Sequence, residues 1–182
     1  MSRTQPANNN SKQRGFSLLE LLAVLLIVGL MLGLVSFAIG GNDAAEKLRD
    51  NAERFTGIIR LAVDDAVLSG EPLGLSFVPG ELDDAWSFYW LRLRDGQWIP
   101  EGAPLQEQHF PEGVSVDLQL SGETYDWTQA RPAVETPIII FYPSGESQTF
   151  IITLRSQYAP DGDQHIGNSV AGDILWKERP GV

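Results

Sequence analysis

Residues 16–39 read FSLLELLAVLLIVGLMLGLVSFAI, an apolar stretch in which Glu20 is the single ionisable side chain. As an α-helix rising about 1.5 Å per residue it would extend roughly 36 Å, more than the bilayer hydrocarbon core of about 30 Å. A secretory signal would have a shorter apolar region of about 7–15 residues, followed by a small-residue cleavage site. The stretch is therefore predicted to be a transmembrane helix.

The charges that flank this stretch predict its orientation. Arg3, Lys12 and Arg14 precede it without any acidic residue, whereas the first charge after it is Asp43. Basic flanks stay on the cytoplasmic side of a membrane. Residues 1–15 are thus predicted to be a basic cytoplasmic leader, and the chain beyond the helix is predicted to lie outside the cytoplasm.

Composition excludes several classes of function. The chain of 182 residues carries a formal charge of −11, which argues against binding nucleic acid. It contains no cysteine, so disulfides, thiolate metal sites and cysteine nucleophiles are excluded. His109 and His165 are its two histidines, and no catalytic serine motif accompanies them. We predict that the chain is not an enzyme and has no catalytic residues.

Glu20 is unusual because a carboxylate inside a membrane helix costs about 2.5–3.5 kcal/mol on insertion scales. One interpretation is that Glu20 lies near the helix start and reaches the lipid headgroups. The other follows from a cut between Gly15 and Phe16, which would place a charged amine four residues before Glu20. Amine and carboxylate of adjacent copies would then neutralise one another and set the axial register of an assembly.

The order of basic leader, Gly15, Phe16, Glu20 and apolar span closely resembles the class III signal of type IV prepilins and type II secretion pseudopilins. The resemblance implies that a membrane prepilin peptidase cuts between Gly15 and Phe16 and methylates the Phe16 amine. It assigns Glu20 to assembly. Residues 16–39 would then serve as a transmembrane and assembly helix.

Residues 40–70 are predicted to continue as an amphipathic helix. Apolar residues recur at spacings of four and three, which defines one packed stripe. Asn42 or Asp43 is suited to cap a helix start, Gly70 to end it, and Pro72 to block continuation. The stripe consists of Leu48, Ala52, Phe55, Ile59, Ala62 and Ala66, with Val63 beside it.

Beyond Pro72 the apolar period changes to two, which predicts strands. The predicted strands cover residues 73–78, 86–93, 114–120, 138–142, 149–155 and 169–176. The uniformly apolar 138–142 is interpreted as a central strand, and residues 143–146 (PSGE) as the turn of a hairpin to the next strand. A helix followed by strands predicts an α+β fold with antiparallel sheets, whose β-rich body spans residues 71–182.

This order of elements, with FYPSGE at residues 141–146 and TFIITL directly after Gln148, resembles the minor pseudopilins of the H class in type II secretion. The resemblance implies a type IV pilin-like fold with an antiparallel β-sheet or β-sandwich body. It also implies a single-pass protein of the inner membrane with a periplasmic body, which joins a periplasmic pseudopilus near its tip. Its partners would be the major pseudopilin and other minor pseudopilins, and the pseudopilus would help to export folded proteins across the outer membrane.

Two alternatives stay open from the sequence. One is a minor type IV pilin of a surface pilus or a DNA-uptake system, although DNA capture would favour a basic loop where this body is acidic. The other is a periplasmic binding protein or hydrolase that uses the helix only as an anchor. It predicts activity in residues 43–182, for which no catalytic set is present.

Two regions of the body are candidate binding sites. Asp161 and Asp163 alternate as in a calcium loop, but the glycine and glutamate that such a loop requires are absent, so a solvated turn is the preferred interpretation and no cofactor is expected. The long loop at 122–137 contains Tyr125, Trp127 and Arg131. Aromatic and arginine side chains are typical interface anchors, so this loop is predicted to contact a partner. The adjacent acids at 64–65 and 83–84 are interpreted as exposed charges.

Overall fold

The fold was analysed in a computed structural model, which describes residues 18–80, 85–128, 136–169 and 172–178, without the side chains of 32–42 and 178. The chain divides into two compact units, Met1–Ile39 and Gly40–Val182. Each is considered by itself below. The second unit contains the strands and is called the body.

The single helix of the described chain, α1, extends over Leu18–Ser69. Gly70 follows in the left-handed conformation with φ of 71°, and its N–H donates to the carbonyl of Ala66, so the predicted end of the helix is confirmed. The prediction that residues 40–70 continue the helix is confirmed, but the capping role of Asn42 or Asp43 was wrong, because α1 runs through both residues. Intrahelical hydrogen bonding continues across the glycines before them, which weaken a helix without ending it.

The predicted apolar stripe of α1 is confirmed as the centre of the body. Its six members are each at most 1% exposed: Leu48, Ala52, Phe55, Ile59, Ala62 and Ala66. Phe55 packs against the rings of Phe77, Phe88 and Phe110 at centroid distances of 6.1, 4.6 and 5.2 Å. The helix is therefore an integral part of the core of the body.

The strands of the described chain form two five-stranded antiparallel sheets. The first contains β1 (Leu73–Val78), β2 (Ser87–Arg94), β3 (Gln97–Pro100), β4 (Gln108–His109) and β7 (Ile139–Phe141). The order β3-β2-β1-β7 is hydrogen bonded, and β4 pairs with β2. The second contains β5 (Val114–Leu120), β6 (Glu123–Thr124), β8 (Phe150–Ser156), β9 (Ala159–Asn168) and β10 (Ile174–Glu178), in the order β10-β9-β8-β5-β6. The predicted α+β fold with antiparallel sheets is confirmed.

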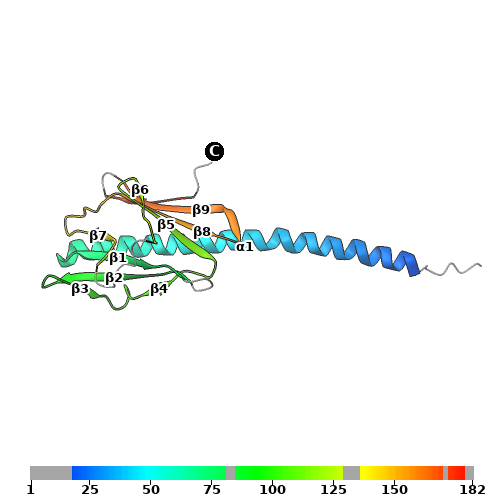
Figure 1. The fold of residues 1–182 in the computed structure, drawn as a ribbon, viewed down its shortest axis with the longest axis horizontal. Coiled ribbons are helices and arrows are strands. Elements are labelled where there is room, and N and C mark those ends of the chain that lie inside the picture. The colour runs from blue at the N-terminus through cyan, green and yellow to red at the C-terminus, as the bar shows by residue number, and fades with distance from the viewer. Residues whose placement is uncertain (1–17, 81–84, 129–135, 170–171, 179–182) are drawn as a thin grey trace, which may run out of the picture. The chain divides into compact units, whose positions relative to one another are not determined.

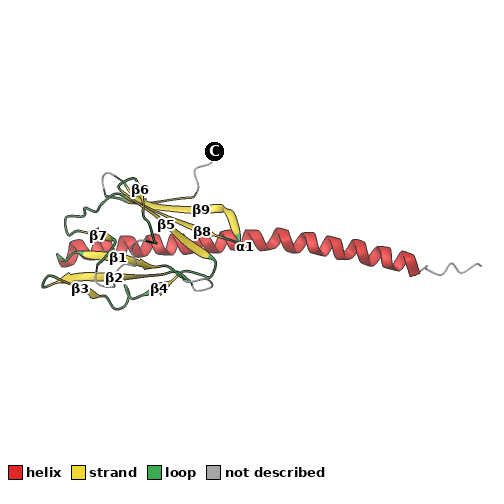
Figure 2. Cartoon of the chain, viewed as in Figure 1, coloured by secondary structure: helices red, strands yellow, loops and turns green. Residues whose placement is uncertain are grey.

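In Figure 1, β2, β3 and β4 lie on one side of the part of α1 that belongs to the body, and β6, β8 and β9 lie on the other. Buried side chains of α1 and of both sheets form one core. The sheets also meet directly, because Phe141 of β7 packs edge-on against Phe150 of β8 at 5.9 Å. Helix and sheets thus share a single interior, in which the helix fills the space between the sheets (Figure 2).

The predicted hairpin at residues 143–146 was wrong in its topology. The tight turn exists, since Tyr142 and Glu146 are joined by a backbone hydrogen bond and Gly145 has φ of 83°. The strands on its two sides, however, belong to different sheets, so the turn carries the chain across the core. β7 is at the end of the first sheet and not central, because β1 is the one strand of the described chain that pairs with it. Ile139 and Phe141 face the core, while Ile140 is half-buried on the other face.

Residues 161–165 were interpreted as a solvated turn, and this was also wrong. They lie within β9, where residues 164–167 pair in register with residues 151–154 of β8. Pairing on both sides of β9 overrides the low strand propensity of its Asp and Gly residues. The last predicted strand begins at Ile174 and not at residue 169, because Ser169 accepts from Gly172 and donates to Asp173 in the turn before it.

Candidate functional site

The predicted processing site at Gly15 and Phe16 lies outside the described residues. Glu20, assigned to assembly, lies in the first turn of α1. An acidic side chain there is favoured by the positive end of the helix macrodipole. The helix start thus provides a favourable place for a carboxylate in an otherwise apolar sequence.

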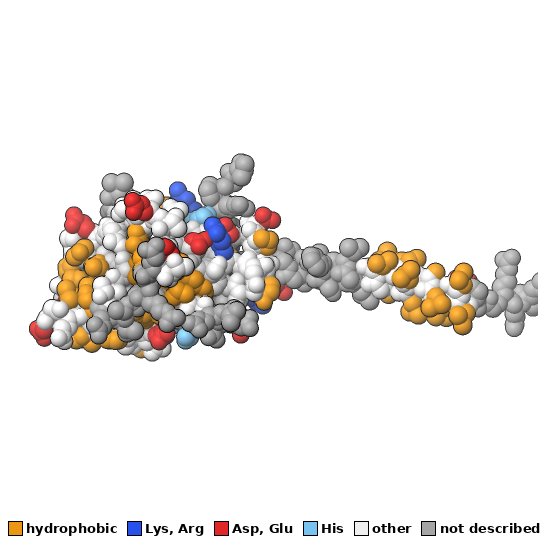
Figure 3. Space-filling view, in the orientation of Figure 1, with side chains coloured by type: hydrophobic (Ala, Val, Ile, Leu, Met, Phe, Trp, Pro, Cys, Tyr) orange, Lys and Arg blue, Asp and Glu red, His pale blue; other side chains and the backbone are white. Residues whose placement is uncertain are grey.

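Residues 18–31 present a continuous apolar surface, which we call the apolar segment. Leu18, Leu26 and Met31 are 81%, 65% and 63% exposed. Hydrophobic side chains cover the face of this segment that is visible in Figure 3. An apolar surface of this kind marks a site that contacts lipid or other proteins.

Among the described residues, no helical stretch reaches both the length and the hydropathy that define a candidate membrane span. The predicted span at 16–39 also includes residues 16 and 17 and the side chains of 32–39, which lie outside the description.

Arg92 of β2 is the centre of a buried ionic cluster that joins the end of α1 to the first sheet. Its Nε donates to Glu101 Oε1 at 2.5 Å and its NH1 donates to Ser69 Oγ at 2.7 Å. Its NH2 bonds Asp65 Oδ2, and Glu71 lies 3.6 Å from NH1. Burial lowers the pKa of Arg92, but the hydrogen bonds and charges of Asp65 and Glu101 outweigh burial and leave that pKa raised. The guanidinium therefore stays charged, and the cluster fixes the position of the helix end.

The interpretation of residues 64–65 as exposed charges agrees with their surfaces, since the Asp65 side chain is 40% exposed, but it missed the ion pair of Asp65. Asp64 is exposed, but Asp65 bonds the buried Arg92. Nothing local in the sequence indicated this pair, because 27 positions separate its members. An Arg between the leucines at 91 and 93 of a mostly apolar strand was the available signal, since a buried cation requires carboxylate partners. Residues 83–84 lie outside the described part of the chain.

The predicted interface residues Tyr125 and Trp127 form an aromatic cluster at the margin of the core. The Trp127 ring lies 4.7 Å from Tyr125, 5.0 Å from Trp86 and 6.0 Å from Phe77. Burial raises the pKa of the Tyr125 hydroxyl. Arg131, the third predicted member, lies outside the described residues. Tyr125 and Trp127 are half-buried, so each keeps some surface that a partner can contact.

Asp161 and Asp163, the candidate calcium ligands, lie on β9. Asp163 Oδ2 accepts from Arg155 Nε at 3.3 Å, and Arg155 NH1 contacts Asp117 Oδ2 at 2.6 Å. The positive charge of Arg155 thus occupies the place next to Asp163 that a cation would need. No group of three or more acidic or histidine side chains with the spacing of a metal site occurs in the described chain.

The two histidines and the turn serine are far apart in the topology. His109 is on β4 of the first sheet, whereas His165 is on β9 of the second, where its Nδ1 lies 3.0 Å from Thr153 Oγ1. Ser144 Oγ lies in the 143–146 turn, 3.3 Å from Glu146 Oε2. The structure brings none of these side chains into a nucleophile–base pair with another.

Comparison with known proteins gives two family matches. Residues 10–40 match the prokaryotic N-terminal methylation motif, and residues 51–171 match the family described as type II transport protein GspH. The first match covers residues 10–15 of the predicted leader, the predicted cleavage site and Glu20. The second covers most of the body.

Named relatives agree with these matches. Type II secretion system protein H of Escherichia coli K12 is 36% identical over 121 residues, which cover 60% of this chain and 66% of the relative, just under two thirds of its length. The protein of the same name from Aeromonas hydrophila is 27% identical over 80% of this chain and 82% of its own. The second relative extends the similarity over 80% of this chain.

Solved structures show the same fold. A structure of the minor pseudopilin EpsH from the type 2 secretion system of Vibrio cholerae is 18% identical, with a TM-score of 0.56 over 71% of this chain and 94% of that chain. A second structure of the same minor pseudopilin gives a TM-score of 0.58 at 19% identity over 72% and 93%. The fold, the body match and the N-terminal motif agree, and the chain therefore belongs to the GspH family of type II transport proteins.

Proposed function

We propose that this chain is a structural subunit incorporated near the tip of a periplasmic pseudopilus, where it binds the major pseudopilin and other minor pseudopilins. Its precursor is anchored in the inner membrane through residues 16–39, with the body in the periplasm. The observation that carries the proposal is the methylation motif over residues 10–40, which coincides with an exposed apolar segment. The pseudopilus then helps to move folded proteins through an outer-membrane channel.

Maturation creates the binding end of the subunit. Prepilin peptidase cuts between Gly15 and Phe16 and methylates the new amine, which leaves a cation four residues before Glu20. When helices pack side by side, the amine of one subunit and Glu20 of its neighbour neutralise each other in apolar surroundings. The apolar segment supplies the lateral packing, and the charge pair sets the register.

The body contributes rigidity to this role. The buried stripe of α1 is enclosed by both sheets, and the Arg92 cluster holds the end of the helix. A subunit built in this way keeps its outer surface in a fixed orientation relative to the part of the helix within the body. The proposed role consists of binding between subunits, so it requires neither catalysis nor a cofactor.

The proposal is tested by isolating the native chain from cells in which the secretion system is active. Mass spectrometry is expected to find an N-terminal N-methylphenylalanine at Phe16. Copurification is expected to recover three other small pilin-like proteins. A chain that retains its leader where maturation works contradicts the processing step, and partners drawn only from a pilus system support a minor type IV pilin instead.

Replacing Glu20 with alanine is expected to leave cleavage largely intact and to reduce incorporation into the pseudopilus by about tenfold or more, because the amine loses its counter-charge in apolar surroundings. The measurement is the fraction of processed protein that copurifies with the major pseudopilin. Glu20→Asp serves as the control, since it keeps the negative charge and is expected to retain part of the incorporation into the pseudopilus. Normal incorporation of Glu20→Ala would refute the charge pair.

A further inference from the structure

The last strand, β10, leaves one backbone edge of the second sheet open. β10 pairs with β9 on one side, and no other described strand pairs with it on the other. Ser169 N donates to Asp173 O, so alternation along the ladder directs Leu175 and Lys177 toward β9. Ile174, Trp176 and Glu178 consequently direct their backbone N–H and C=O groups outward.

Part of this edge is occupied from within the chain. Arg60 of α1 donates from its NH2 to the carbonyl of Ile174 at 2.9 Å, which confirms that this carbonyl faces outward. The ring of Trp176 is fixed by a hydrogen bond of 3.0 Å from its Nε1 to Gln164 Oε1. The backbone groups of Trp176 and Glu178 have no partner in the described chain. The N–H of each can therefore donate to an added strand, and the C=O of each can accept from it.

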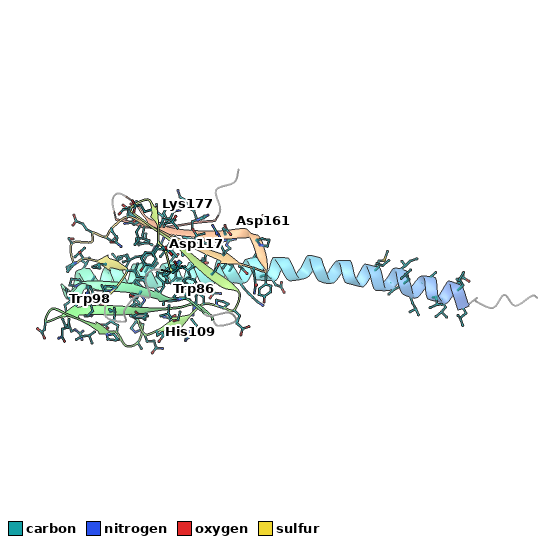
Figure 4. The ribbon with its side chains drawn as sticks, in the orientation of Figure 1. Trp86, Trp98, His109, Asp117, Asp161 and Lys177 are labelled. Atoms are coloured by element: carbon teal, nitrogen blue, oxygen red, sulfur yellow. The ribbon has the colours of Figure 1, made fainter. Side chains whose placement is uncertain are left out.

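Three basic side chains lie at or beside this edge. The guanidinium of Arg49 lies 5.7 Å from the centre of the Trp176 ring, and Arg60 bonds Ile174. Lys177 is exposed on β10 itself, on the side of the body opposite to Trp98 and His109 (Figure 4). None of these three cations forms an ion pair with another described residue, in contrast to Arg92, Arg94 and Arg155.

We propose that the open edge of β10 is a docking site for an acidic extended segment of a partner protein. The segment adds a strand to the second sheet through the backbone of Trp176 and Glu178, as in β-strand addition. Its carboxylates pair with Arg49, Arg60 and Lys177, which supply the charge complementarity that selects an acidic strand over a basic one.

This inference rests on the proposed function only for the source of the strand, which would be another subunit of the assembly. The edge itself is a property of the isolated chain. Binding to a synthetic strand therefore tests the site without the pseudopilus. A chain that assembles and copurifies normally but does not bind such a strand would refute the docking site alone.

The experiment uses the full processed chain in detergent and a capped hexapeptide of alternating glutamate and valine as the probe. Hydrogen exchange is expected to show slower exchange of the Trp176 and Glu178 amides when the peptide is present, with little change in other strands. Added salt is expected to weaken binding, because the cations at the edge are exposed. A lysine–valine peptide of equal length serves as the control and is expected not to bind.

Two variants separate the backbone contribution from the charge contribution. Glu178→Pro removes one outward N–H without a loss in the β9 ladder and is expected to weaken binding about tenfold, whereas Glu178→Ala is expected to bind normally. Arg49→Glu is expected to weaken binding by a similar factor, whereas Arg54→Glu, an exposed position with no ion pair in the described chain, is its matched control.

Equal binding of the lysine–valine peptide would overturn the proposal, as would exchange that slows elsewhere or not at all. Unchanged binding by Glu178→Pro with an unchanged melting temperature would overturn it as well. If that variant does not fold, the exchange pattern of the unaltered chain decides the question.

Discussion

Replacing Phe55 with alanine is expected to lower the free energy of unfolding of the body by about 3–5 kcal/mol. Phe55 is 1% exposed and lies where α1 meets three other phenylalanine rings. The truncation removes these contacts and leaves a cavity that the neighbouring rings can fill only in part. Denaturant unfolding of the full chain in detergent, followed by tryptophan fluorescence, measures the effect.

The matched control for Phe55→Ala is on the same helix. Leu68 is 86% exposed, and Leu68→Ala is expected to change stability by less than about 0.5 kcal/mol. Phe55→Leu, which keeps most of the volume, should give an intermediate loss. Similar losses for Phe55→Ala and Leu68→Ala would show that the stripe of α1 is not the centre of the core.

Replacing Arg92 with methionine is expected to lower the free energy of unfolding by about 2–4 kcal/mol, because charge-assisted hydrogen bonds are lost and the Glu101 carboxylate stays behind partly desolvated. The Arg92 side chain is 6% exposed, and that of its partner Glu101 is 18% exposed. Since the pKa of Arg92 is raised, the guanidinium should stay charged, and the cluster should persist, up to strongly alkaline pH. The same unfolding measurement reports the loss.

Arg155 provides the comparison for Arg92. It also contacts two aspartates, Asp117 and Asp163, but its side chain is 56% exposed. Arg155→Met is therefore expected to cost less than about 1 kcal/mol, as is usual for a solvated ion pair. Equal losses at the two positions would contradict the view that burial makes the Arg92 cluster important. The double variant Arg92→Met with Asp65→Leu should lose less stability than the sum of the two single variants, since the Arg92 and Asp65 side chains interact directly.

The helix could be predicted in detail because its signals are local. The spacing of Leu48, Phe55 and Ile59 assigns the buried face, and Gly70 with Pro72 assigns the end. The N-terminal site was recognisable for the same reason, since Gly15, Phe16 and Glu20 stand at fixed spacing and the family match covers them. Their individual roles stay predictions.

Features that depend on distant partners could not be predicted in this way. β9 contains residues that normally favour turns, and it is a strand because β8 and β10 flank it. The 143–146 turn has the composition of a hairpin, but its flanking strands join different sheets because Phe141 and Phe150 pack face to edge across the core. The Arg92 cluster joins the end of α1, β2 and Glu101 after β3, which only the tertiary fold brings together.

The position of β8 between β5 and β9 has a consequence for the order in which the body can fold during synthesis. Four strands of the first sheet come from one contiguous stretch of chain, whereas β5 must wait for residues 150–156 before it gains its main neighbour. A nascent polypeptide that ends before residue 150 therefore leaves Val114, Val116 and Leu118 without their cover. Residues 150–156 supply the neighbouring strand that completes the surroundings of these three side chains.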